Sequence, residues 1–389
     1  MPEYQILVPP PRRHRRLWTT VIVVVIVVVV AAGAFVVGRH VEDSRHASKD
    51  HGGGKTGSVT TPFAVSSTVP ASGATDVSSN QVVTVHLSAP VASAGTPTFN
   101  PPVAGSWTRT GPKSLSFDAT APFIPMSTET LSIPAGSSGP RSATGQALAT
   151  PDTITFTVAQ ASTERLQQLL AQLEYLPLAF TPTAPLKSPA DATTAQAGSF
   201  AWRWPNPPPS LTALWMEGYE NVITKGAVMD FENQNGLTVD GLAGPRVWST
   251  LLADIASGKV DADPYTYAYV SKVLPETLTM YENGAPVLSD ISVNTGAPGA
   301  DTVDGTFPVF EHVTSSRMQG TNPDGTKYDD PDVPWASYFN GGDALHGFVR
   351  ASYGFPQSNG CVEMRISDAA KVWPLSPIGT LVTVVGPAS

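Results

Sequence analysis

One cysteine and one nearby histidine are the residues of this 389-residue chain whose types and spacing suit nucleophilic chemistry. Cys361 is the only cysteine, so it cannot form an intramolecular disulfide. It follows Ser358, Asn359 and Gly360 in a turn whose backbone N–H groups could form an oxyanion hole for acyl transfer. The residues alone leave two roles open for the sulfur: a small buried apolar side chain or a reactive nucleophile.

A reactive thiol also needs a general base. Five of the seven histidines precede residue 100, which leaves His312 and His346 in the C-terminal part. His346 is followed by Gly347, which allows a tight turn, and it precedes Cys361 by a loop long enough to bring imidazole and thiol together. We therefore expect His346 to be the base and His312 to contribute little.

Four segments around these residues form a recognisable set. They are His346-Gly347, Ser358-x-Gly360-Cys361-Val362, Trp335 to Gly342, and Thr302-Val303-Asp304-Gly305-Thr306-Phe307. This set resembles the L,D-transpeptidases with a YkuD-like catalytic domain, over roughly residues 264 to 386. The sequence departs from that family's pattern at three positions. Val303 replaces a proline, Asn359 stands where histidine is usual, and Glu363 stands where arginine or asparagine is usual.

The resemblance implies a mechanism. Cys361 would attack, as thiolate, the carbonyl before the terminal D-Ala of a peptidoglycan tetrapeptide stem, after His346 takes its proton. A free thiol near pKa 8.5 is only a few per cent ionised at neutral pH. The N–H groups of Gly360 and Cys361 would form the oxyanion hole, and the carbonyl of Gly347 would fix the imidazole tautomer. An amine of a second stem would resolve the thioester to a three-to-three cross-link, with no cofactor or metal.

Four further residues are expected at the site. Asn359 can donate an N–H through its amide but cannot be a base. Tyr338, Ser358 and Arg365 are expected to line the substrate site, although a core or surface role is an equally open interpretation for Tyr338 and Arg365.

Two other functions remain open. The same scaffold could serve a peptidoglycan L,D-carboxypeptidase or hydrolase, in which water resolves the thioester. It could also serve a catalytically silent wall-binding protein, an interpretation motivated by Asn359 and opposed by the intact His346 and Cys361.

The N-terminus predicts a membrane protein. Residues 1–16 end in a basic cluster, and residues 17–38 are an uncharged apolar run of bilayer-spanning length. The positive-inside rule then places residues 1–16 in the cytoplasm and the rest of the chain outside, facing the cell wall. A cleavable signal peptide is the rival interpretation. Residues 39–62 are predicted to be a flexible linker, and their irregularly spaced histidines indicate a solvated linker rather than a metal site.

The remaining chain predicts three folded domains. Residues 63–160 alternate short β-rich runs with turns and resemble a bacterial Ig-like β-sandwich. Residues 164–258 are predicted to be helical with a Pro-rich insertion. Their segment Gly236 to Trp248 resembles a peptidoglycan-binding three-helix module, with Val247 in place of a threonine. This module would bind the wall or merely orient the catalytic domain.

Residues 264–386 are expected to form a mostly-β catalytic domain. Asn283-Gly284 predicts a hairpin, and Ser367 and Asp368 are expected to cap a short helix. The cysteine loop is expected at the surface, where it would meet ends of a polymer. The net charge of −9, with no basic stripe after the first segment, disfavours nucleic acid as a partner.

Overall fold

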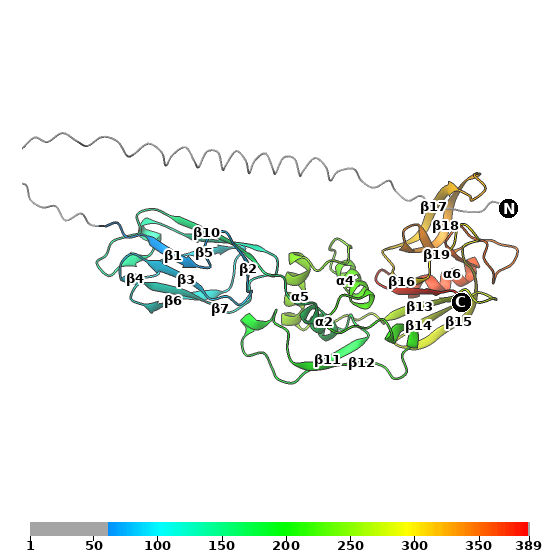
Figure 1. The fold of residues 1–389 in the computed structure, drawn as a ribbon, viewed down its shortest axis with the longest axis horizontal. Coiled ribbons are helices and arrows are strands. Elements are labelled where there is room, and N and C mark those ends of the chain that lie inside the picture. The colour runs from blue at the N-terminus through cyan, green and yellow to red at the C-terminus, as the bar shows by residue number, and fades with distance from the viewer. Residues whose placement is uncertain (1–60, 388–389) are drawn as a thin grey trace, which may run out of the picture. The chain divides into compact units, whose positions relative to one another are not determined.

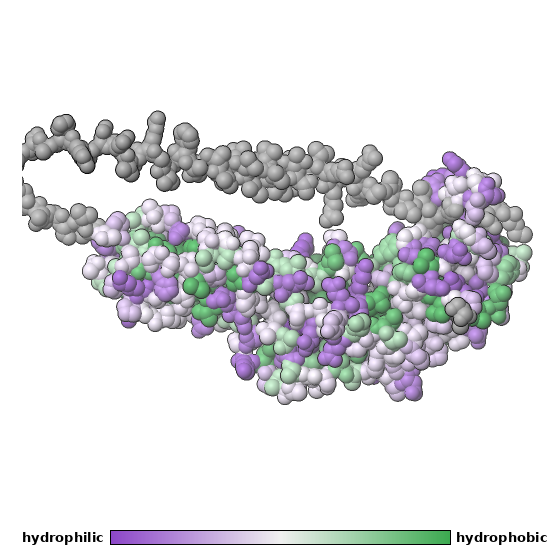
Figure 2. Space-filling model, viewed as in Figure 1, coloured by the Kyte–Doolittle hydropathy of each residue, from purple (hydrophilic) through white to green (hydrophobic). Residues whose placement is uncertain are grey.

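The computed structural model describes residues 61–387 (Figure 1). The predicted cytoplasmic segment, the predicted anchor and the predicted linker up to residue 60 lie outside the described residues. Within residues 61–387, no helix is both long enough and apolar enough to cross a membrane. The face in Figure 2 is mostly hydrophilic or intermediate in hydropathy, with apolar residues in small groups.

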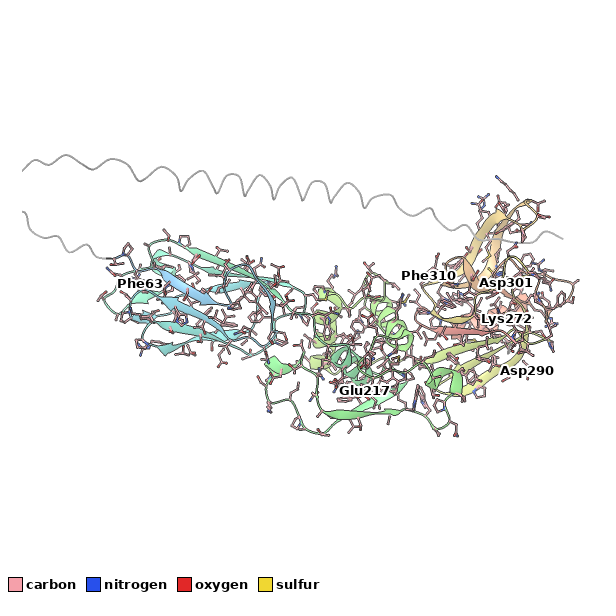
Figure 3. All side chains as sticks on the ribbon, viewed as in Figure 1. Phe63, Glu217, Lys272, Asp290, Asp301 and Phe310 are labelled. Carbon is pink, nitrogen blue, oxygen red and sulfur yellow. The ribbon has the colours of Figure 1, made fainter. Side chains whose placement is uncertain are left out.

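The first domain is the predicted β-sandwich, with two four-stranded sheets in the orders β1-β3-β7-β6 and β2-β10-β8-β5 and a small β4-β9 pair. Its core draws on both sheets and includes Val85, Leu131 and Phe156, and Phe63 (Figure 3) is buried in it. Alternating burial in β3 shows why the sequence forms such strands: one side chain in two faces the core. The strands are β1 Val65–Val69, β2 Ala74–Val77, β3 Val83–Leu87, β4 Val91–Ser93, β5 Thr98–Asn100, β6 Gly105–Gly111, β7 Ser114–Ala119, β8 Thr128–Ile133, β9 Arg141–Ser142 and β10 Asp152–Val158, with the 3-10 turn η1 Gly136–Ser138.

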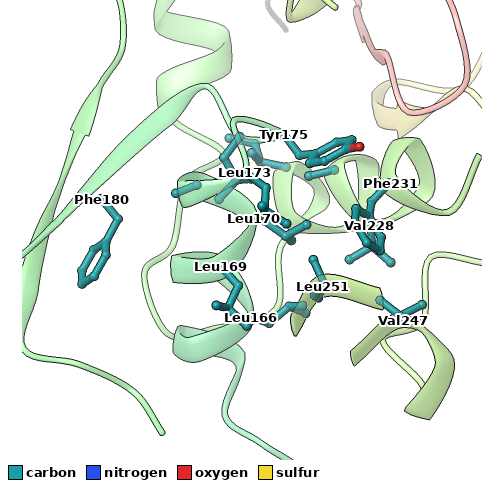
Figure 4. Packing of buried hydrophobic residues seen from close by; sticks show 14 of the residues in the cluster. Leu166, Leu169, Leu170, Leu173, Tyr175, Phe180, Val228, Phe231, Val247 and Leu251 are labelled. Atoms are coloured by element: carbon teal, nitrogen blue, oxygen red, sulfur yellow. The ribbon is translucent and has the colours of Figure 1, made fainter. Parts of the chain in front are cut away.

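The next segment contains four α-helices, three of which pack together, and a two-stranded antiparallel sheet. Leucines at helical spacing in α2 meet side chains from α4 and α5 in one buried cluster (Figure 4). Ser162 caps α2 by accepting a hydrogen bond from the Arg165 N–H, and Pro245 occupies the first turn of α5. The elements are α2 Thr163–Gln172, β11 Leu178–Pro182, η2 Pro189–Asp191, β12 Gly198–Trp202, α3 Pro209–Thr212, α4 Val222–Gln234 and α5 Pro245–Ser257. Wall binding by this segment stays a prediction.

The Asp-Gly pair between α4 and α5 has a structural role. The carboxylate of Glu232, which is 1% exposed, accepts hydrogen bonds from the N–H groups of Asp240 at 3.0 Å and Gly241 at 2.8 Å. Gly241 adopts a φ of +71°, which favours glycine. These contacts fix the turn that precedes α5.

The helices also share their core with the C-terminal domain. Tyr267 and Leu381, each 1% exposed, belong to the same buried cluster as the leucines of α2. Helix α4 comes so close to the turn before β21 that a Cβ on Gly226 would lie 2.6 Å from the carbonyl oxygen of Gly379. The packing therefore requires glycine at position 226.

The C-terminal domain is a nine-stranded sheet in the order β16-β21-β13-β14-β15-β20-β19-β18-β17. Its elements are β13 Thr266–Ser271, β14 Thr277–Glu282, β15 Ala285–Asn294, β16 Gly305–Pro308, β17 Glu311–Thr321, β18 Lys327–Asn340, β19 Asp343–Gly347, β20 Val362–Met364, α6 Ile366–Val372, η3 Trp373–Leu375 and β21 Leu381–Val385. Most neighbouring strands are antiparallel, but β13 pairs with β21 and β19 with β20 in parallel. The domain is mostly β, as predicted.

Two local predictions have different outcomes. Asn283 and Gly284 have φ values of 51° and 78° and join β14 to β15, so the predicted hairpin is confirmed. The predicted capping of the short helix is wrong. Helix α6 begins at Ile366 after Arg365, without a side-chain cap, so Ser367 and Asp368 lie inside its first turn.

Candidate active site

The parallel pair β19–β20 brings the predicted base and nucleophile onto one face of the sheet. Leu345 pairs with Val362, and His346 pairs with Glu363. Leu345 and Val362 point into the main core, so by strand alternation His346 and Glu363 point to the opposite face. Cys361 immediately precedes β20 and packs with Ala344 in a separate cluster.

His346 is fully buried and is held in one tautomer. Its Nδ1 lies 3.1 Å from the carbonyl oxygen of Gly347, which can only accept, so Nδ1 carries the proton. Its Nε2 is buried without a hydrogen-bond partner. Burial lowers the pKa of the imidazole, and the nearby carboxylate of Glu363 opposes that shift. The resting imidazole is therefore neutral, with a free lone pair on Nε2.

Cys361 is 3% exposed, and its Sγ donates to the carbonyl oxygen of Gly342 at 3.8 Å. Burial raises the thiol's pKa well above its usual value, and the carboxylates of Asp343 and Glu363 raise it further. A hydrogen bond from the backbone N–H of Ala344 opposes the shift. The thiol is therefore less ionised than a free cysteine at neutral pH, so both the thiol and the imidazole of His346 rest in their neutral forms.

The cysteine loop is covered rather than exposed, which corrects the sequence prediction. Cys361 packs against Met318, Tyr328 and Tyr338, which come from the long hairpin β17–β18. This hairpin removes the sulfur from water, and desolvation is the largest cause of the raised thiol pKa.

Buried hydrogen bonds shape the backbone around the cysteine. Thr302 Oγ1 donates to the carbonyl oxygen of Gly360 at 2.7 Å and accepts from the N–H of Gly296 at 2.9 Å. Ser358 Oγ donates to the carbonyl oxygen of Cys361 at 2.6 Å and accepts from the N–H of Gly360 at 3.3 Å. The Gly360 N–H, expected to be an oxyanion donor, is directed to Ser358 in this resting structure.

Glu363 belongs to a buried ion pair. Arg350 donates from Nε to Oε2 at 2.8 Å and from the second guanidinium nitrogen to Oε1 at 2.9 Å. The two side chains are 4% and 0% exposed. The guanidinium also lies 5.0 Å from the ring centre of Phe348, which contacts His346 edge-on. The positive charge of Arg350 therefore compensates the negative charge of the buried Glu363 carboxylate, which lies next to the imidazole.

Asp343 is a second carboxylate beside the sulfur. It lies between Gly342 and Ala344, the two residues whose backbone contacts Sγ. Its Oδ1 lies so close to Gly360 that a Cβ there would be 2.3 Å from it. Burial raises the pKa of Asp343 to about 7. A hydrogen bond from the neutral amide of Asn340 opposes that shift.

Comparisons with known proteins identify two domains. Residues 266–384 match the model of the L,D-transpeptidase catalytic domain, and residues 59–158 match that of the bacterial Ig-like domain. The chain carries an L,D-transpeptidase catalytic domain. A comparison with functionally curated proteins found no match.

Solved structures of L,D-transpeptidases also match parts of the chain. The enzyme from Mycobacterium smegmatis is 14% identical, with 84% of this chain and 100% of that chain covered and a TM-score of 0.28. L,D-transpeptidase 3 from Mycobacterium tuberculosis, in complex with a faropenem-derived adduct, is 13% identical, with coverage of 82% and 97% and a TM-score of 0.28. The catalytic domain from E. faecium is 25% identical, with coverage of 32% and 100% and a TM-score of 0.28.

The predicted substrate residues of the L,D-transpeptidase domain fall in different places. Tyr338 packs in the cluster of Cys361, but its hydroxyl is hydrogen-bonded to Ser316 at 2.6 Å. Ser358 is fully buried and its hydroxyl orders the loop, so its contact with substrate stays a prediction. Arg365 is exposed, lies over the ring of Tyr353 at 4.7 Å and pairs with Asp368, which places it outside the cluster around the sulfur.

Asn359 connects two parts of the L,D-transpeptidase domain. Its Nδ2 donates to the side-chain oxygen of Asn322 at 2.8 Å, at the tip of the β17–β18 hairpin. Its Oδ1 is buried without a hydrogen-bond partner. The amide of Asn359, expected to be a donor, therefore orders the cysteine loop against the hairpin in the resting structure.

Sequence reasoning missed Arg350, Asp343 and Asn322. Glu363 was the available signal for Arg350, because an acid in place of a usual arginine or asparagine needs a compensating cation once buried. Asp343 and Asn322 gave no comparable signal. Among residues 61–387, no group of three or more His, Cys, Asp and Glu side chains is arranged to hold a metal ion.

Proposed function

We propose that this chain is a cell-wall L,D-transpeptidase that forms three-to-three peptidoglycan cross-links through a Cys361 thioester. The observation that carries the proposal is the buried, unpartnered Nε2 of His346 on the same sheet face as Cys361, within the matched catalytic domain. Its tautomer, set by the Gly347 carbonyl, makes Nε2 an acceptor for the thiol proton.

Acylation begins from the neutral pair. The thiol leaves the Gly342 carbonyl and gives its proton to His346 Nε2 as the sulfur attacks the carbonyl before the terminal D-alanine of the donor stem. A carbon–sulfur bond forms, the carbon–nitrogen bond breaks, and His346 returns the proton to the departing amine. Because both groups start neutral, the proton moves with the attack rather than before it.

Resolution consumes the thioester. The side-chain amine of a second stem attacks the same carbonyl, a carbon–nitrogen bond forms, and the thiolate of Cys361 leaves and is reprotonated. Water in place of the amine would give carboxypeptidase activity.

We propose an extracytoplasmic location for this activity, with residues 17–38 as a membrane anchor. The support is the uncharged apolar run after a basic cluster. The helical segment 164–258 would orient the catalytic domain, since the two share a buried cluster.

Product analysis tests the proposed reaction. A synthetic tetrapeptide stem ending in D-alanine is incubated with the protein, with and without an acceptor amine, and the products are separated by mass spectrometry. The proposal predicts that D-alanine is released and that an amide forms between the tripeptide and the acceptor. Both products should depend on Cys361. Release without any amide product would identify a carboxypeptidase, and no release would support the silent wall-binding interpretation.

A further inference from the structure

The position of Asp343 is unfavourable for the first half of the proposed reaction. Its carboxylate lies within the 342–344 segment that contacts Sγ, and it makes the neighbouring thiol harder to ionise. Nothing in the acylation step uses a negative charge there. A carboxylate in this place would suit a later step that needs a negative charge.

Among residues 61–387, the carboxylate of Asp343 also has no cationic partner. Its pKa is affected by burial and by the neutral amide of Asn340, whose Nδ2 lies 3.4 Å from Oδ2, and by no lysine, arginine or histidine. Glu363, by contrast, has both oxygens engaged by Arg350. Asp343 therefore keeps its capacity to bind a cation brought by a substrate.

Asp343 also remains reachable at the cysteine turn. It is partly exposed, whereas Cys361, His346 and Glu363 are buried. Its Oδ1 lies against Gly360, the residue directly before the nucleophile, where a Cβ would be only 2.3 Å away, and the φ of +114° there also favours glycine. An incoming group bound by Asp343 would thus lie beside the thioester.

We propose that Asp343 binds the ammonium group of the acceptor and takes a proton from it during resolution of the thioester. This inference rests on the proposed transpeptidase function. Of the three ammonium protons, one goes to Asp343 before attack, one goes to the departing Cys361 sulfur as the carbon–sulfur bond breaks, and one stays on the new amide. A carboxylate with a pKa of about 7 accepts such a proton better than an ordinary aspartate.

The test separates the two half-reactions. The donor is an N-terminally acetylated tetrapeptide with Nε-acetylated lysine at its third position and a C-terminal D-alanine, so that it has no free amine and cannot act as acceptor. The acceptor probe is Nα-acetyl-lysine methylamide, and acetyl-norleucine methylamide is the amine-free control. D-alanine release reports acylation, and the ratio of amide product to hydrolysed tripeptide reports resolution.

Asp343→Asn keeps the size of the side chain and removes its charge. We expect D-alanine release to stay within about threefold of wild type or to rise, while the amide-to-hydrolysis ratio falls about a hundredfold or more, the loss expected for a general base. Asp290→Asn removes an exposed carboxylate elsewhere in the domain (Figure 3) and should change neither quantity.

Three results would overturn the inference. The first is an unchanged amide-to-hydrolysis ratio in Asp343→Asn, and the second is an equal loss in both half-reactions. The third is a wild-type amide-to-hydrolysis ratio in Asp343→Ser, which has no carboxylate. A wild-type protein that releases D-alanine but makes no amide would refute the proposed transpeptidation, and the acceptor role with it. Asp343→Ser also serves as the second variant if Asp343→Asn does not fold.

Discussion

Glu363 places a negative charge in a site where no water can solvate it, and Arg350 supplies the charge that balances it. The bidentate contact fixes both side chains, and the fully buried carboxylate lies next to His346 in the strand register. Breaking such a pair leaves an uncompensated buried charge, which costs more than replacing both partners.

Arg350→Met should therefore lower the free energy of unfolding by about 3–5 kcal/mol. The double variant Arg350→Met with Glu363→Gln should recover much of that loss, because no charge is left buried alone. Urea denaturation of the two single variants and the double variant measures the coupling. Additive losses would show that the ion pair does not act as a unit.

The contact between Asn359 and Asn322 predicts matched effects of two distant substitutions. Asn359→Ala and Asn322→Ala should each slow carbapenem acylation by about two- to tenfold, the value of one hydrogen bond, and the double variant should be no slower. Asn359→His should stay within about tenfold of wild type, because its ring can still donate.

Carbapenem acylation rates of the wild type and these variants, measured across pH, check this prediction. A hundredfold loss confined to Asn359→Ala would indicate an oxyanion donor instead, and no loss would remove Asn359 from the site. Faster acylation by Asn359→His would indicate that a histidine here performs proton chemistry.

The site residues that could be predicted from the sequence are those whose side-chain type permits few chemical roles. Cys361 and His346 are the lone thiol and a histidine with a suitable spacing, and the structure places both on one face of the sheet. Arg350, Asp343 and Asn322 could not be assigned, because their roles depend on contacts between separate loops. Burial of the thiol was missed for the same reason, since it depends on a distant hairpin.

At the scale of elements, helix α4 carries a carboxylate in an unfavourable environment. Burial raises the pKa of Asp230 to about 7, and the neighbouring Asp261 adds to the shift. The folded state thus holds a proton more tightly than the unfolded state does. The free energy of unfolding should fall as pH rises from the unfolded value of 3.8 to about 7.

Asp230→Asn should stabilise the protein at pH 8 and have little effect near pH 4, where the native carboxyl is protonated. Gln234 can still donate to the new amide oxygen, as it does to Asp230 Oδ1. Thermal melts at both pH values measure the difference. An equal gain at both would attribute the effect to packing instead of charge.

Elements that carry their own local signals could be predicted from the sequence. The predicted helical segment 164–258 contains α2, α4 and α5, and Asn283-Gly284 predicted the turn between β14 and β15. The start of α6 was misplaced. Ser and Asp cap a helix only at the N-cap position, and in α6 that position is occupied by Arg365.

At the scale of the whole molecule, the helical segment and the catalytic domain are joined by a common core. Tyr267 and Leu381 of the catalytic domain are buried among side chains of α2 and α4. A fragment of residues 264–389 should therefore expose apolar surface, melt at a lower temperature and aggregate, whereas a chain beginning at Pro62 should remain soluble. An undiminished melting temperature for the fragment would show that the two parts are independent.

The most direct test of the central claim, that Cys361 and His346 form an acyl-transfer site, is the intact mass of the protein after exposure to a carbapenem. We expect one adduct per chain, on Cys361 by peptide mapping. We also expect no adduct on Cys361→Ala and acylation slowed by about two orders of magnitude or more in His346→Ala, as expected for loss of a general base. An unmodified mass under conditions that label a control enzyme, or an adduct retained by Cys361→Ala, would contradict the central claim.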